Sequence, residues 1–105
     1  MSVARINMVD WRSEQLFAEK TKNTDATMRQ QFPNAEIMLR IKTTPTSVVA
    51  ISIYPSQEKA DDARVELDKR MGGYGDAVKD HWFLEGEVIS AHINEEWLEE
   101  SRKDK

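Results

Sequence analysis

Cysteine is absent from this chain of 105 residues, and glycine and proline are scarce, with four and three residues. The absence of cysteine excludes disulfide bonds, thiolate metal sites and thiol nucleophiles, and it fits a reducing compartment. We therefore expect a cytoplasmic protein. No run approaches the roughly 18 apolar residues of a membrane span, and the segment from Met1 to Asn7 lacks the apolar stretch of a secretion signal. We expect no membrane partner.

Positive charge is also in short supply. Lys and Arg number 15 against 19 Asp and Glu, so the formal net charge is −4, and the pI is near 5.2. Nucleic-acid binding depends on clustered basic residues that neutralise phosphates, so we expect no nucleic-acid partner. The length is that of one domain, 1–105, in which 94–105 forms a C-terminal tail or a short helix.

The hydrophobic period changes along the chain in a definite order: strand-like alternation, helical spacing, two alternating runs, helical spacing, and alternation again. This order predicts a ferredoxin-like βαββαβ sandwich of class α+β, with one antiparallel sheet and both helices on one face. The other face of such a sheet needs a cover. The expected strands are 3–10, 35–42, 47–54 and 81–93, and the expected helices are 13–31, with a break near Asn23, and 55–71.

The more apolar side of each strand is expected to form the core. It holds Ala4, Ile6 and Met8 in the first strand and Val49, Ile51 and Ile53 in the third. Strict alternation splits the apolar residues of the last strand between two faces. We therefore expect a β-bulge near Gly86, because one inserted residue reverses the alternation. The bulge would gather, facing the helices, Trp82, Leu84, Ile89, Ala91 and Ile93.

The histidines and the paired glutamates do not predict a catalytic or metal centre. His81 and His92 lie eleven residues apart on one expected strand, which separates them by more than about 30 Å. Glu85 and Glu87 have the spacing of an acid–base pair, but nothing in the sequence supplies the apolar pocket that would raise the pKa of one carboxyl. We therefore expect no metal and no cofactor.

The aromatic residues and the five methionines are the stronger chemical signal. They either form only the core of a small domain or also line a pocket between sheet and helices for a small apolar, acyl or aromatic ligand. Asn7, Ser52, Arg5 or a histidine would orient the polar end of that ligand. The expected lining is Ile6, Met8, Phe17, Met28, Tyr54, Leu67, Met71, Tyr74 and Trp82.

The run from Val48 to Ala60 leads from a strand into a helix, with an aromatic residue at the strand end. It resembles the central motif of the antibiotic-biosynthesis-monooxygenase-like family, and Glu85-Gly86-Glu87-Val88 is similar to members of the same dimeric α/β-barrel superfamily. The resemblance implies a homodimer in which two sheets pack into a barrel, with any ligand site between the sheet and helices of each subunit. It places on the partner-facing side Val9, Met38, Val48, Ala50 and Val88, with Arg5, Arg40, Lys42 and His92 among them.

The same resemblance implies two activities beside simple binding. The superfamily includes cofactor-free monooxygenases that act on phenolic or quinol substrates through Asn and Trp, and haem-degrading enzymes that use an Asn, a Trp and a proximal His. The catalytic candidates in this chain are Asn7, Trp82 and His81, whereas Tyr54 stands where the family has a tryptophan at the end of the third strand. An ACT-like regulatory domain stays open as a further alternative.

Overall fold

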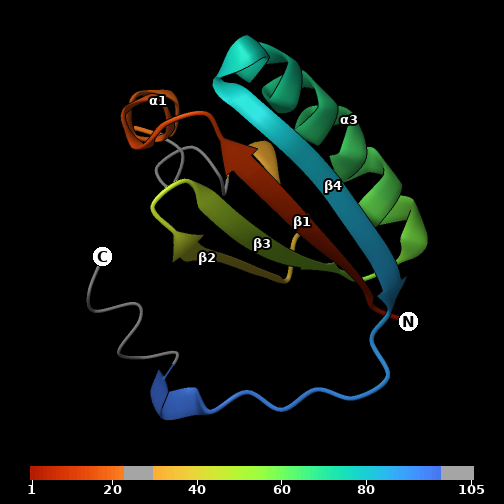
Figure 1. Ribbon diagram of the computed structural model, residues 1–105. Helices are drawn as coiled ribbons and strands as arrows, with labels where there is room; N and C mark the ends of the chain where they lie inside the picture. The colour runs from red at the N-terminus through yellow and green to blue at the C-terminus, as the bar shows by residue number, and fades with distance from the viewer. Residues whose placement is uncertain (23–29, 98–105) are drawn as a thin grey trace.

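The computed structural model describes residues 1–22 and 30–97. It contains a four-stranded antiparallel sheet in the order β2-β3-β1-β4 (Figure 1). The ferredoxin-like arrangement predicted from the order of hydrophobic periods is confirmed. The elements are β1 (Val3–Trp11), α1 (Glu14–Lys20), β2 (Ile37–Thr44), β3 (Ser47–Tyr54), α3 (Gln57–Tyr74), a 3₁₀ turn (Gly75–Ala77) and β4 (Val78–Glu87).

The long helix α3 covers one face of the sheet (Figure 1). The guanidinium of Arg5 in β1 donates from Nη2 to the carbonyl oxygen of Ala60 in α3 at 2.7 Å, which identifies the helix-facing side. Arg5 is paired with Ser52 of β3 and with Glu85 of β4, so these residues share that side. The core beneath α3 is a cluster of Val3, Phe32, Tyr54, Ala60 and Ala63.

The opposite face of the sheet carries most of its aliphatic side chains. The expectation that this apolar set faces the helices is wrong, because alternation shows which residues share a face but not which face the helices cover. The residues expected on the partner-facing side are misplaced for the same reason: the strand pairing places on the helix side Val9, Met38, Val48, Ala50, Arg5, Arg40 and Lys42. The register places on the uncovered face Ala4, Ile6, Met8, Ile37, Leu39, Ile41, Val49, Ile51, Ile53, Trp82 and Leu84.

The expected bulge at Gly86 is also wrong. β4 stays in register with β1 through Gly86 and ends at Glu87, and the shift in pairing falls at the other end of β1, between Asp10 and Trp11. No bulge is needed because the apolar residues of 81–93 do not all belong to the strand. Residues 88–94 continue without regular structure, and Ile89 is 91% exposed.

Both helices begin where the sequence predicts. Ser13 caps α1 by accepting from the backbone N–H of Leu16, and Ser56 caps α3 by accepting from Lys59. α1 ends at Lys20, well before the expected end near residue 31. At Lys20 the chain enters a run of poor helix formers. The expected break near Asn23 lies outside the described residues.

The end of α3 lies one turn beyond the expected Met71. The helix continues through the two adjacent glycines to Tyr74, and its C-cap, Gly75, takes a φ of 56°. A positive φ suits glycine because it has no side chain to collide with the backbone. The following 3₁₀ turn then leads the chain directly into β4.

A C-terminal segment follows the sheet and extends away from it (Figure 1). Asn94 caps its short helical turn, because its Oδ1 accepts from the backbone N–H groups of Glu96 and Trp97 at 2.8 and 3.2 Å. The turn begins where the tail or short helix of 94–105 was expected, while 98–105 lie outside the described residues. Within the described ranges no helix is both long enough and apolar enough to cross a membrane.

Candidate functional site

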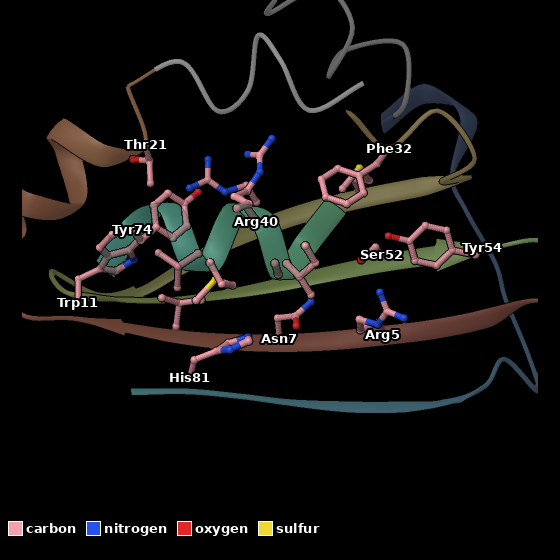
Figure 2. Close-up of a pocket in the computed structure, with 17 residues that line it drawn as sticks. Arg5, Asn7, Trp11, Thr21, Phe32, Arg40, Ser52, Tyr54, Tyr74 and His81 are labelled. Carbon is pink, nitrogen blue, oxygen red and sulfur yellow. The ribbon is translucent and has the colours of Figure 1, made fainter. Parts of the chain in front are cut away.

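A cavity of about 90 Å³ lies between the sheet and α3. That is space for several water molecules, since one water needs about 10 to 15 Å³, or for one small ring. Figure 2 shows the labelled side chains of β1, β3 and β4 pointing from the sheet into this space. The lining consists of Arg5, Asn7, Val9, Trp11, Thr21, Phe32, Met38, Arg40, Val48, Ala50, Ser52, Tyr54, Leu67, Arg70, Met71, Tyr74 and His81.

Aromatic rings form one end of this cavity. The ring centroids of Trp11 and Tyr74 lie 4.8 Å apart in an edge-on arrangement, which is favourable for the ring quadrupoles. The ring centroid of Phe17 in α1 lies 5.7 Å from that of Trp11. Trp11 therefore contacts both α1 and the end of α3, and both helices pack against the same end of β1.

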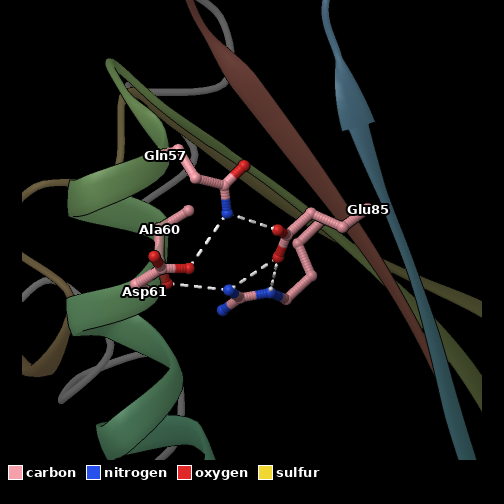
Figure 3. A network of polar contacts seen from close by, with 5 residues as sticks. Gln57, Ala60, Asp61 and Glu85 are labelled. Atoms are coloured by element: carbon pink, nitrogen blue, oxygen red, sulfur yellow. Dashed lines mark hydrogen bonds and ion pairs between the residues drawn. The ribbon is translucent and has the colours of Figure 1, made fainter.

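Arg5 is anchored at the other end, beside Tyr54 (Figure 2). It is 1% exposed, and its Nε and Nη2 donate to Oε2 of Glu85 at 3.1 and 2.9 Å. Gln57 of α3 donates to the second oxygen of Glu85 at 2.6 Å and to Asp61 at 2.9 Å (Figure 3). The hydrogen bond from Gln57 and the adjacent guanidinium hold the pKa of the Glu85 carboxyl below its usual value.

Several buried polar atoms of the cavity residues have no hydrogen-bond partner. Such atoms are rare in folded proteins, because a buried donor or acceptor without a partner costs about 1 to 3 kcal/mol. In the described part of the chain, every buried side-chain atom of this kind belongs to a residue that lines the cavity. The atoms are Arg5 Nη1, Asn7 Oδ1, Arg70 Nε and Nη2, and His81 Nε2.

His81 is the titratable base of this lining. Burial lowers the pKa of its imidazole, and the nearby carboxylates of Asp68 and Asp80 offset only part of that effect. Its ordinary pKa is 6.5, so the ring is mostly neutral at pH 7. A neutral imidazole has one nitrogen that can accept a hydrogen bond or a proton.

The charge of the lining is positive. It includes Arg5, Arg40 and Arg70 and contains no Asp or Glu among the described residues. The charge of Arg5 is balanced by Glu85, whereas no ion pair joins Arg70 to any part of the chain that the structure describes. The guanidinium of Arg70 instead lies 5.5 Å from the centre of the Phe32 ring.

The structure brings together some of the predicted site residues and separates others. Tyr54, Leu67, Met71 and Tyr74 line the cavity, and so do the catalytic candidates Asn7 and His81. Phe17 lies behind Trp11, and Met28 falls outside the described residues. The expectation that Ile6, Met8 and Trp82 line the pocket is wrong, because all three lie on the opposite face of the sheet, where Met8 pairs with Trp82.

Sequence reasoning missed the cationic part of the cavity. Arg40 was expected to face a partner subunit, and Arg70 was not among the expected site residues. The helical spacing held a signal for Arg70, because it lies between Leu67 and Met71 on the inward side of α3. For Trp11 the signal was its spacing from Arg5 in the same strand. The two residues are an even number of positions apart, so their side chains lie on the same face of the sheet.

No metal or haem site is assembled from the described residues. They contain no group of three His, Cys, Asp or Glu side chains that could hold a metal ion. His81 is the only histidine of the described lining, and the cavity volume lies well below the roughly 300 Å³ at which pockets for drug-sized ligands begin. The described geometry therefore gives no support to the haem alternative.

A scan against protein-family models and a search of the curated proteins found no match. Solved structures do match. A dimeric ferredoxin-like protein from an uncultured marine organism is 15% identical, with a TM-score of 0.72, over 89% of this chain and 92% of that one. A candidate antibiotic biosynthesis monooxygenase from Caulobacter crescentus is 10% identical, with a TM-score of 0.68, over 85% and 91% of the two chains.

A third match is a variant of SnoaB, a cofactor-independent oxygenase from Streptomyces nogalater. It is 15% identical to this chain, with a TM-score of 0.63, and the alignment covers 86% of this chain and 95% of SnoaB. At such identities the matches describe the fold. The chain has the ferredoxin-like α+β fold that its structural neighbours, the dimeric ferredoxin-like and antibiotic biosynthesis monooxygenase proteins, share.

Proposed function

We propose that this protein is a homodimer in which each subunit binds one small apolar, acyl or aromatic molecule in the cavity between the sheet and α3. The observation that carries the proposal is the set of unpartnered polar atoms around the cavity. A ligand with an apolar body and one polar end would contact the aliphatic and aromatic walls and supply the missing hydrogen-bond partners. The buried polar atoms would then cease to be a cost to the protein.

The uncovered apolar face supports the dimer. Ile41, Trp82 and Leu84 are 45%, 43% and 61% exposed on it, and soluble monomers rarely keep so continuous an apolar sheet face in water. A second copy of the same face would bury both. The dimeric ferredoxin-like protein among the structural matches supports the same assembly.

A cavity-filling substitution tests the binding proposal. Ala50 lines the cavity, and Ala50→Leu adds three carbons to that space. In thermal melts with phenol, indole or 1-hexanol, we expect a ligand that raises the Tm of the parent protein to lose its effect in Ala50→Leu. The matched control is Ala18→Leu on the exposed side of α1, which should keep the shift. A ligand that binds only the folded state raises the Tm, and the shift grows with the concentration of free ligand.

The binding proposal fails if none of these probes, nor benzoate, shifts the Tm at millimolar concentration. It also fails if Ala50→Leu responds like the parent protein. Native mass spectrometry under gentle conditions gives an independent check, because a retained small molecule would appear as an added mass on each subunit.

Cofactor-free oxygenation is a second candidate, favoured by the neutral His81 and by the match to SnoaB. His81 Nε2 would take a proton from a phenolic or quinol substrate, and the Asn7 amide would orient the resulting oxyanion. A ring CH₂ that becomes C=O takes one atom of O₂, and the other atom leaves as water. An anthrone that is consumed in air but not under argon, and that is consumed more slowly by the His81→Gln variant, would support this activity. Equal turnover with and without oxygen would contradict it.

A further inference from the structure

We propose that the polar end of the ligand is a carboxylate and that Arg70 is the residue that binds it. This inference rests on the binding function proposed above and adds the chemical class of the ligand. One edge of the Arg70 guanidinium is buried and has no hydrogen-bond partner, and this observation supports the inference.

Arg70 presents two unpartnered donors on the same edge of its guanidinium. Both Nε and Nη2 are buried without a hydrogen-bond partner. Their N–H bonds run parallel on that edge, and the spacing of such a pair matches the two oxygens of a carboxylate. The Phe32 ring, 5.5 Å from the guanidinium, stacks against the group but offers no acceptor for these donors.

Arg5 offers a comparison within the same protein, because the corresponding edge of its guanidinium binds a carboxylate. Its own Nε and Nη2 both donate to one carboxylate oxygen, Oε2 of Glu85, at 3.1 and 2.9 Å. The cavity thus has one arginine whose edge is occupied by a carboxylate of the chain and a second whose equivalent edge is empty. The described lining contains no Asp or Glu that could occupy it.

The remaining polar groups of the cavity favour an anion over a neutral or cationic ligand. Arg5 Nη1 is a further donor without a partner, and Arg5 is almost fully buried. Asn7 is 5% exposed and has an unpartnered amide oxygen, so it can pair with a hydroxyl on the same ligand. An ammonium ligand would meet guanidinium groups and, in the described part of the lining, no carboxylate to pair with.

Size and donor geometry favour a carboxylate over a phosphate ester. A phosphoryl group carries three acceptor oxygens arranged as a tetrahedron, and burying it requires partners for all three. The empty edge of Arg70 offers two donors in one plane, inside a cavity of about 90 Å³. A planar arylcarboxylate or a short-chain fatty acid uses both donors and leaves its apolar part against the aliphatic and aromatic walls.

The test compares three probes that share one ring, by isothermal titration calorimetry at pH 7 on the full chain. Benzoate is the expected ligand, benzamide is its neutral analogue of the same shape, and phenyl phosphate carries the alternative anion. We expect benzoate to bind at least about tenfold more tightly than either, because charged hydrogen bonds are about twice as strong as neutral ones. Arg70→Met should reduce benzoate affinity about tenfold or more and leave benzamide binding nearly unchanged.

Two variants control for charge and for geometry. Lys69→Met removes the same charge from a side chain of α3 that is 71% exposed and lies outside the cavity lining, so it should keep the preference for benzoate. Arg70→Lys keeps the charge but loses the paired edge, so it should recover only part of the affinity. If Arg70→Met does not fold, the Arg70→Lys variant and the comparison of probes on the parent protein still decide the matter.

The outcomes separate the two proposals. Equal binding of benzoate and benzamide, or benzoate affinity unchanged in Arg70→Met, overturns the carboxylate inference while the binding function stands. Tighter binding of phenyl phosphate overturns it in favour of a phosphate ligand. No binding of any of the three, together with no response to the neutral probes named above, overturns the proposed function itself.

Discussion

At the scale of single residues, the buried charge of Arg5 fixes the positions of its own polar partners beneath α3. Its guanidinium is almost fully buried and bonds to the Ala60 carbonyl in α3 and to Glu85 in β4. Burying such a charge is costly unless it is paired, and pairing fixes the partners in position. Arg5 therefore links the central strand, an edge strand and the helix, and it keeps one of its nitrogens directed at the ligand space.

The first prediction concerns the partner of this charge. Glu85→Gln should lower the free energy of unfolding at pH 7 by about 1 to 3 kcal/mol, because Arg5 is then left with an uncharged partner. Glu87→Gln, an exposed neighbour on the same side of β4, should change it by less than about 0.5 kcal/mol. Urea unfolding monitored by circular dichroism measures both. Equal effects of the two substitutions would contradict this role of Glu85.

The same pair predicts a pH dependence. The pKa of Glu85 is lower in the folded protein than its ordinary 4.5, so its contribution to stability is complete above about that pH and is lost as pH falls through the lowered value. The stability difference between the parent protein and Glu85→Gln should therefore shrink steadily below pH 4.5. A difference that stays constant down to the acid unfolding transition would contradict the ion pair.

At the scale of elements, α3 begins at its capping serine but runs about one turn past its expected end, and the glycines near that end allow a test with opposite signs. Gly75 has a φ of 56°, whereas Gly72 lies inside the helix, and nothing stands within 4 Å of a Cβ added at either. Gly75→Ala should destabilise the protein by about 1 kcal/mol because alanine resists a positive φ. Gly72→Ala should stabilise it by about 0.5 to 1 kcal/mol through helix propensity. Thermal melts of both variants measure the difference, and stabilisation by Gly75→Ala would contradict the observed helix end.

The element order, the helix starts and the four strands could be predicted because each depends on local signals: alternation, a capping serine or a glycine. The positions at which two elements end could not be predicted from the sequence. The end of α1 at Lys20 depends on competition between a weak helix run and the rest of the fold. The expected bulge at Gly86 came from assigning Ile89 and Ile93 to the last strand, whereas β4 stops at Glu87. Apolar residues in a tail and in a strand look alike in the sequence.

At the scale of the whole molecule, the two faces of the sheet have exchanged the roles expected from their composition. The face with Ile6, Ile51 and Leu84 is open, and the face with Arg5 and Asn7 is covered by α3. A period of two assigns residues to the same face and gives no sign of which face is inside. When only one subunit is considered, the apolar face is expected to form the core beneath the helices. This is why Ile6, Met8 and Trp82 were wrongly expected to line the pocket. The exchange is physically reasonable once the apolar face packs against a second subunit.

The most direct test of this account is the mass of the protein in solution at micromolar concentration, measured by sedimentation equilibrium on the parent protein and two variants. We predict a dimer of about 24 kDa, twice the 12.1 kDa of one chain. Leu84→Glu on the open face should produce a folded monomer. Val65→Glu, a similarly exposed apolar position on α3, should remain a dimer. A monomeric parent protein, or a Leu84→Glu variant as dimeric as the parent, would contradict the assignment of the open sheet face as the dimer interface.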